Sequence, residues 1–136
     1  MIRPINHDQL TLARPSRPAT RQNQAVITDL QDTLRANAER CVGMAANMIG
    51  VNVQIIIAAS GMLQLILINP TITAKAQPYQ TQEGCLSLSG ERPTERFETI
   101  TVQYLDAQWQ PHTQTFTGFL AQIIQHECDH CQGILI

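Results

Sequence analysis

Hydrophobic positions follow two different periods along the chain, which together predict a mixed α and β structure. Apolar residues recur every three or four positions from Gln24 to Ala38, as they do on the buried face of a helix. Farther along, short apolar runs alternate with turn residues, which is typical of strands. The predicted strands cover residues 51–58, 62–69, 71–76, 82–86, 99–104 and 112–117. The first two are expected to form a hairpin across residues 59–61, and Pro70 is expected to end the second.

Helical spacing returns near the end of the chain, from about Phe119 to Gln132. The apolar side of this predicted helix carries Phe119, Leu120, Ile123 and Ile124. The side predicted to face away from it carries Gln122, Gln125, Asp129 and Gln132. His126 and His130 continue one edge of the apolar side. Since buried polar groups are costly without partners, we expect both imidazoles to be hydrogen-bonded or to bind a metal.

The two histidines belong to the sequence His126-Glu127-Cys128-Asp129-His130, a His-Glu-x-x-His motif. This spacing places two imidazoles one helical turn apart on the same face, where both can reach one ion. Glu127 lies beside them and is the expected general base of a metal-dependent hydrolase. The motif therefore predicts a metal site that carries its own base.

A catalytic site of this kind needs a third protein ligand and an open position for water. Because only six residues follow His130, we expect the third ligand to lie upstream of the motif. Cys85, in Glu83-Gly84-Cys85-Leu86-Ser87, is the best candidate, since coordination deprotonates a thiol outright. Cys128 and Cys131 project toward the apolar side of the helix, and we interpret them as small core residues.

Three segments in this order resemble the peptide deformylase family: residues 43–50, residues 83–87 and residues 125–130. The resemblance covers about residues 24 to 136. It implies an α+β fold in which antiparallel β-sheets surround a C-terminal metal-binding helix, as in a peptide deformylase. We expect residues 1–136 to form a single metallohydrolase domain of this type.

The resemblance also implies a set of site residues and a cofactor. The metal ligands would be Cys85, His126 and His130. The catalytic groups would be the Glu127 carboxylate and the backbone N–H of Leu86. Substrate-binding residues would be Val42, Gly43, Met48, Glu83 and Gly84. One divalent ion is expected, with ferrous iron as the native metal and zinc, nickel or cobalt as substitutes.

Met48 departs from the family pattern at a position that matters for the reaction. The family has a glutamine there, and its amide joins the N–H of Leu86 in stabilising the oxyanion. A methionine thioether donates no hydrogen bond. Loss of one such donor typically costs about 3–4 kcal/mol, or roughly a hundred- to a thousand-fold in rate. The neighbouring Asn47 is expected to point elsewhere. Downstream, Arg92 and Arg96 lie about where the family carries an arginine near the peptide, but a solvated loop explains them equally well.

The implied reaction removes the N-formyl group from the N-terminal methionine of nascent polypeptides. Its substrate would be an N-formylmethionyl peptide, met close to the ribosome. Because of Met48, two alternatives stay open: a catalytically silent relative that binds metal and peptide N-termini, or a hydrolase of another N-acyl compound. The intact Glu127 favours an enzyme, since a mere binding site needs no base there.

Composition excludes some other classes of protein. Nine basic and eleven acidic residues among 136 give a net charge of −2 without a basic run, which argues against nucleic acid as a partner. The apolar runs are too short to span a membrane, and the N-terminus lacks the apolar core of a signal peptide. We therefore expect a cytoplasmic protein that is a monomer or a homodimer.

Overall fold

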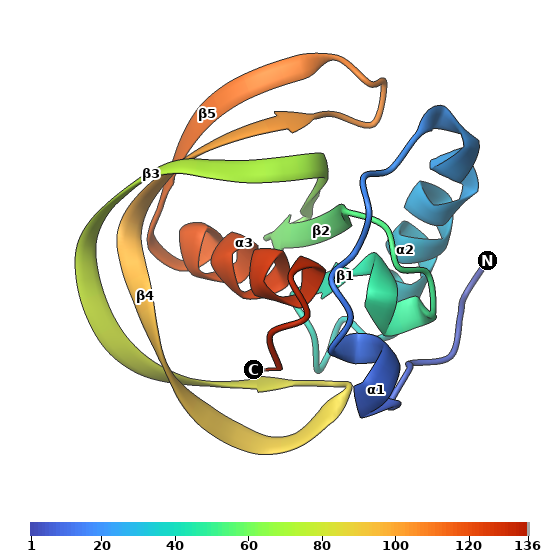
Figure 1. Ribbon diagram of the computed structural model, residues 1–136, viewed down its shortest axis with the longest axis horizontal. Helices are drawn as coiled ribbons and strands as arrows, with labels where there is room; N and C mark the ends of the chain where they lie inside the picture. The colour runs from blue at the N-terminus through green and yellow to red at the C-terminus, as the bar shows by residue number, and fades with distance from the viewer. Residues whose placement is uncertain (136) are drawn as a thin grey trace.

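The computed structural model describes residues 1–135, in which one antiparallel sheet curves around a C-terminal helix (Figure 1). The sheet has five strands in the order β1-β2-β3-β4-β5. Their bounds are β1 Gly43–Ala45, β2 Ile55–Ser60, β3 Leu63–Cys85, β4 Leu88–Leu105 and β5 Pro111–Thr117. The α-helices are α1 Gln9–Leu12, α2 Gln24–Ala36 and α3 Gly118–Cys131. Two 3-10 helices are η1 Arg21–Asn23 and η2 Ala46–Ile49. The predicted α+β class is confirmed.

Strand β3 corrects the prediction that Pro70 ends a strand. It runs for 23 residues and joins three segments that were predicted to be separate strands. The pairing with β4 shifts register between Ile68 and Thr71, and Asn69 there has a φ of 51°. A bulge of this kind accommodates a proline, because the ladder needs no N–H from a residue left out of the pairing. Strands β3 and β4 thereby form one long curved ribbon.

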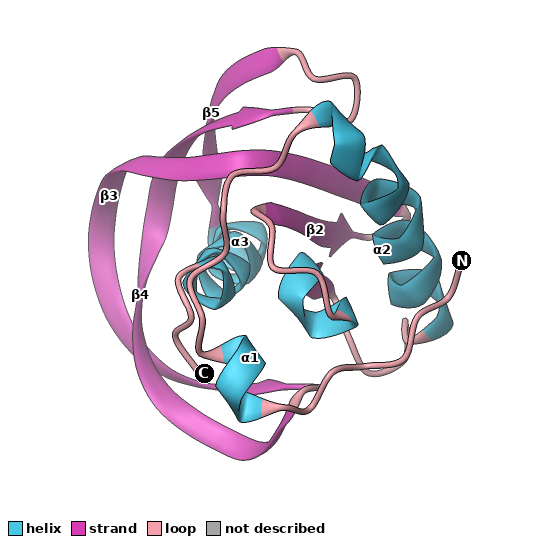
Figure 2. Ribbon diagram, turned by 45° about the vertical axis from the view of Figure 1, so that its right-hand side comes forward, coloured by secondary structure: helices cyan, strands magenta, loops and turns pink. Residues whose placement is uncertain are grey.

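Strand β2 lies between α2 and α3 (Figure 2). Its side chains from Ile55 to Ala58 are all buried, and they belong alternately to two apolar layers. Ile55 and Ile57 pack in the cluster that contains the buried residues of α2. Ile56 and Ala58 pack in the other cluster, with the buried residues of α3. Because side chains of a strand point alternately to opposite faces, one short apolar strand anchors both helices. The strand starts at Ile55 and not at residue 51 as predicted.

Residues 43–50, predicted to be a loop, instead form β1 and η2. Strand β1 pairs with β2 through Gly43 and Ala58, and η2 ends at Gly50 with a φ of 88°. All of residues 43–49 are buried. This segment therefore lies in the interior beside α3 and is fixed by the sheet.

The end of α3 is fastened to the N-terminal segment. Ser16 N–H donates to the Cys131 carbonyl, and Ile134 N–H donates back to Asp129 across Gly133, whose φ is 77°. This pattern is a Schellman cap, in which glycine takes the left-handed position. Within residues 1–135, none of the helices has the length and apolar character needed to cross a membrane.

We expect Gly133→Ala to destabilise the protein more than Gly61→Ala. Both glycines have positive φ, 77° and 62°, so alanine is strained at either position. A Cβ at residue 133 would overlap the Ala13 carbonyl oxygen, whereas no atom of the described residues lies within 4 Å of a Cβ at residue 61. Backbone strain predicts a loss of about 1–2 kcal/mol for both, and the overlap predicts about 1–3 kcal/mol more for Gly133→Ala. Urea unfolding of both variants measures the difference, and equal losses would contradict the prediction.

Candidate metal centre

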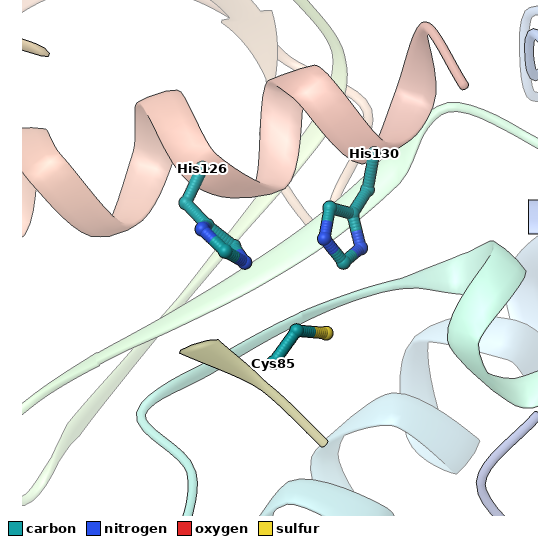
Figure 3. Close-up of side chains that lie close together, drawn as sticks. All are labelled: Cys85, His126 and His130. Carbon is teal, nitrogen blue, oxygen red and sulfur yellow. The ribbon is translucent and has the colours of Figure 1, made fainter. Parts of the chain in front are cut away.

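Cys85, His126 and His130 converge on one point between β3 and α3 (Figure 3). Each offers one ligand atom, and these atoms lie within 4.8 Å of one another. Cys85 ends β3, while the two histidines stand one turn apart on α3 with ring centroids 4.7 Å apart. Both histidines are buried and Cys85 is half-buried. The structure therefore brings together the three residues predicted as metal ligands.

Glu83 fixes the orientation of His126. Its Oε1 lies 2.7 Å from His126 Nδ1, so Nε2 is the ring nitrogen left to face Cys85. The same carboxylate accepts hydrogen bonds from Arg96, the shortest at 2.7 Å, and from Gln122 Nε2 at 2.8 Å. Arg96 also pairs with Asp129 at 2.7 Å. Glu83 lines the cavity as expected of a substrate-binding residue, but its oxygens are engaged in holding His126.

The contacts of this network shift the pKa values of Glu83 and His126 in opposite directions. Burial by itself raises the pKa of Glu83, but hydrogen bonds from His126, Arg96 and Gln122 outweigh it and lower the pKa to about 2. Burial likewise lowers the pKa of His126, yet hydrogen bonds with Cys85 and Glu83 raise it to about 10.

The thiol of Cys85 responds to the same neighbours. Burial raises its pKa, while hydrogen bonds with His126 and His130 lower the pKa to about 7. A thiol of this kind is deprotonated to a large extent near neutral pH, and thiolate is the form that binds metal. The thiolate of Cys85 and the imidazoles of His126 and His130 are a set of ligands that fits a divalent ion such as zinc or iron.

Glu127 carries an open hydrogen-bond acceptor beside the ligands. The residue is 4% exposed, and its Oε1 lacks a hydrogen-bond partner within the described part of the chain. The same oxygen lies 3.9 Å from His130 Nδ1. Buried polar atoms are rarely left without partners, and such exceptions often mark catalytic groups or unseen water. This oxygen is placed to accept a proton inside the site.

A cavity of about 560 Å³ opens beside the ligand cluster. Its lining includes all five residues predicted to bind substrate: Val42, Gly43, Met48, Glu83 and Gly84. Leu86 and Glu127 line the same space. A Cβ at Gly43 would lie 2.6 Å from Ile123 Cγ2 and 3.1 Å from Glu127 Oε2, which explains why glycine is needed there.

Met48 lines this cavity, and its side chain acts as a hydrogen-bond acceptor. It is 1% exposed, and its Sδ accepts a hydrogen bond from Ala45 N–H at 3.5 Å. Asn47 points away, as expected, because its Nδ2 donates to the backbone carbonyl of His130 at 2.9 Å. The side chains of residues 47 and 48 therefore add no donor to the cavity wall.

The side of α3 that was predicted to face away from the apolar residues is covered at three of its four positions. Gln125 is buried and bonds to the backbone of Phe97, Asp129 pairs with Arg96, and Gln122 lines the cavity. The reason is the long ribbon of β3 and β4, which curves over this side of the helix (Figure 1). Helical periodicity marks apolar faces and misses a face covered by polar partners.

Burial distinguishes the two arginines that follow the cysteine motif. Arg96 is 4% exposed inside the Glu83 network, whereas Arg92 is half-exposed and donates to the Ser89 carbonyl. The spacing from the cysteine motif did not show which of the two arginines lies in the site.

Cys128 and Cys131 are buried in the apolar cluster of α3, which confirms their interpretation as core residues.

We expect Glu83→Gln to destabilise the metal-free protein by about 3–5 kcal/mol, because it leaves the buried Arg96 without its main partner. Urea unfolding at neutral pH measures the loss. Glu95→Gln is the matched control, since Glu95 is exposed and, among residues 1–135, its side chain bonds only to Gln80. A loss similar to that of the control would contradict the structural role of Glu83.

The stability contributed by Glu83 should also depend on pH. Its pKa falls from an ordinary 4.5 to about 2 on folding, so its contribution is complete above pH 4.5 and disappears as the pH approaches 2. Unfolding free energies measured across this range should therefore decline more steeply for the natural protein than for Glu83→Gln. Parallel curves would show that Glu83 does not titrate as proposed.

Comparison with known proteins agrees with this geometry. The sequence profile of a family described as polypeptide deformylase matches residues 2–136. A peptide deformylase of Clostridium beijerinckii is 54% identical over 136 residues, which are 100% of both chains. Peptide deformylase 1 of Nitrosomonas europaea is 34% identical over 152 aligned residues, covering 99% of this chain and 85% of the relative.

Solved structures share the architecture. A Met-Ala-Ser-bound class I type b peptide deformylase from Acinetobacter baumannii has a TM-score of 0.89 at 27% identity, with 99% of this chain and 97% of the other covered. A peptide deformylase from Legionella pneumophila has a TM-score of 0.88 at 32% identity, with 99% and 83% covered. The fold predicted from the three motifs is confirmed, and the chain belongs to the polypeptide deformylase family.

Proposed function

We propose that this protein is a metal-dependent amidohydrolase that removes the N-formyl group from the N-terminal methionine of nascent polypeptides. The observation that carries the proposal is the convergence of Cys85, His126 and His130 beside the open carboxylate oxygen of Glu127. Residues 1–136 would act as a single domain. Formate and a peptide with a free amino group would be the products.

Cys85, His126 and His130 would hold one divalent ion. We propose ferrous iron as the native metal, with zinc, nickel or cobalt able to replace it, because this donor set suits each of them. When bound, such an ion polarises a carbonyl group and acidifies a water molecule. The network from Glu83 to Arg96 keeps the His126 ring in a fixed orientation, and such outer contacts are typically worth ten- to a hundred-fold in metal affinity or activity.

Glu127 would act as the general base and then as the general acid. Its Oε1 is buried and open to a new partner, so it can take a proton from water at the formyl carbon. The same carboxyl group can then return this proton to the amine that leaves as the C–N bond breaks. Burial excludes competing proton donors from bulk water, which keeps the transfer local.

The backbone N–H of Leu86 would donate to the carbonyl oxygen as negative charge develops on it. Val42, Gly43 and Gly84 would bind the peptide along the cavity wall, where Gly43 leaves room for the substrate next to Glu127. Met48 supplies no second donor. We therefore propose a working deformylase with a weakened oxyanion site; the family relationship favours this over a silent or redirected protein.

The proposed partner is an N-formylmethionyl peptide, met in the cytoplasm near the ribosome. The Acinetobacter baumannii relative was solved with Met-Ala-Ser bound, which supports a peptide as the ligand of this protein. The net charge of −2 offers no general attraction to ribosomal RNA, so any ribosome contact would be local. We propose no role for nucleic acid or membrane, and a monomer or homodimer as the working state.

Formate release from formyl-Met-Ala-Ser tests the proposal directly. Protein purified without oxygen and loaded separately with iron, nickel or zinc should turn over, and Glu127→Ala should lose about a hundred-fold or more of kcat, as expected for a general acid–base. Glu39→Ala, which removes an exposed carboxylate, is the control. Absence of turnover at full metal occupancy, or activity that survives Glu127→Ala, would contradict the proposed reaction.

We expect Met48→Gln to raise kcat/KM by about ten-fold or more, because it restores a donor at the oxyanion. A glutamine of similar length can accept from Ala45 N–H through Oε1, as Met48 Sδ does now, and still present Nε2 to the cavity. Met48→Leu, which keeps the volume but adds no donor, should show no gain. Equal rates for all three proteins would remove the oxyanion argument.

A further inference from the structure

The cavity has one polar side chain on a stripe of α3 that is otherwise apolar up to the metal centre. Phe119, Gln122, Ile123 and His126 line the cavity at helical spacing. Phe119, Ile123 and Val42 offer apolar surface to the cavity. Gln122 is the polar residue on this stripe between Phe119 and His126, and Gln82 and Glu83 bring further polar groups to the lining from β3. An amide in this position needs hydrogen-bond partners.

The amide of Gln122 is held in one orientation. Its Nε2 donates to Glu83 Oε2 at 2.8 Å, and its Oε1 accepts from Tyr79 Oη at 3.4 Å. Glu83 is fixed in turn by Arg96 and His126. An amide nitrogen has two hydrogens, and the bond to Glu83 uses one of them. The second hydrogen is available to a bound molecule in the cavity.

Gln122 lies where the first side chain of a bound peptide would end. It precedes His126 by one helical turn, which corresponds to about 5–6 Å along α3. If the formyl group reacts beside His126 and Glu127, the adjacent residue's side chain can lie along α3 toward Phe119. An extended four-atom side chain covers a similar distance, about 5 Å, so its third or fourth atom would meet Gln122.

We propose that Gln122 is a specificity-determining residue that donates a hydrogen bond to the thioether sulfur of the substrate's N-terminal methionine. This inference rests on the proposed deformylase function. The cavity would then distinguish methionine from norleucine, which has the same shape but carries a methylene in place of the sulfur. Phe119, Ile123 and Val42 contact the aliphatic part of the side chain without distinguishing the two.

A cavity wall without a hydrogen-bond donor and a wall with one predict opposite preferences between methionine and norleucine. An apolar wall favours norleucine, since burying a methylene is more favourable than burying a polar atom without a partner. A wall with a fixed donor favours methionine, because norleucine leaves the amide hydrogen buried and unpaired. The ratio of kcat/KM for the two substrates therefore reports on this contact. A change in metal occupancy affects both rates equally and cancels in the ratio.

The test compares formyl-Met-Ala-Ser with formyl-norleucyl-Ala-Ser. The natural protein should prefer the methionine peptide by about three- to ten-fold, as one weak hydrogen bond would give. Gln122→Leu should bring the ratio to one or below. Tyr79→Phe, which loosens the amide, should give an intermediate ratio. Gln82→Leu is the matched control, since Gln82 lines the same cavity from β3 and should leave the ratio unchanged.

An unchanged ratio in Gln122→Leu would overturn the inference, and so would an equal shift in Gln82→Leu. If neither peptide releases formate, the proposed function fails while this inference stays testable by binding. Calorimetry with Met-Ala-Ser and norleucyl-Ala-Ser then makes the same comparison. A methionine preference that Gln122→Leu abolishes supports the contact, and equal affinities in the natural protein overturn it.

Discussion

The buried ion pair between Glu83 and Arg96 is the interaction on which the site depends. It joins β3 to β4, and through His126, Gln122 and Asp129 it joins both strands to α3. A buried charge without a partner is strongly destabilising, so these groups are constrained to remain together. The metal ligands on α3 therefore take their position from a network that lies outside the ligand set.

This arrangement links the fold to the chemistry. The long ribbon of β3 and β4 exists because a bulge at Ile68 to Thr71 carries the strand past Pro70. This strand runs from the apolar cores to Cys85, and the strand beside it brings Arg96 to α3. Strand β2 supports the opposite side by packing against both helices. The ligands thus lie on rigid elements, which favours a fixed geometry.

The sequence predicted the chemistry better than the surroundings of the site. Cys85, His126, His130 and Glu127 were found because their spacing carries direct chemical meaning. The continuity of β3 was missed because local turn signals do not report a bulge, which depends on pairing with a distant strand. The contacts of Gln122 and Asp129 were missed for a related reason: their partners are residues 83 and 96, and helical periodicity contains no information about them.

Met48 is expected to affect the rate of the reaction more than the binding of the substrate. Its thioether satisfies the Ala45 N–H, so the backbone of β1 and η2 keeps its position and the peptide can still bind along the cavity. A glutamine there would meet the same backbone requirement and also donate to the oxyanion, which exists only as the reaction proceeds. Interactions made only in the transition state affect kcat, whereas uniform ones affect KM. Methionine in place of the family's glutamine at position 48 should therefore lower kcat while leaving substrate affinity largely intact. Selectivity for the first side chain of the substrate would then depend on the cavity wall that contains Gln122.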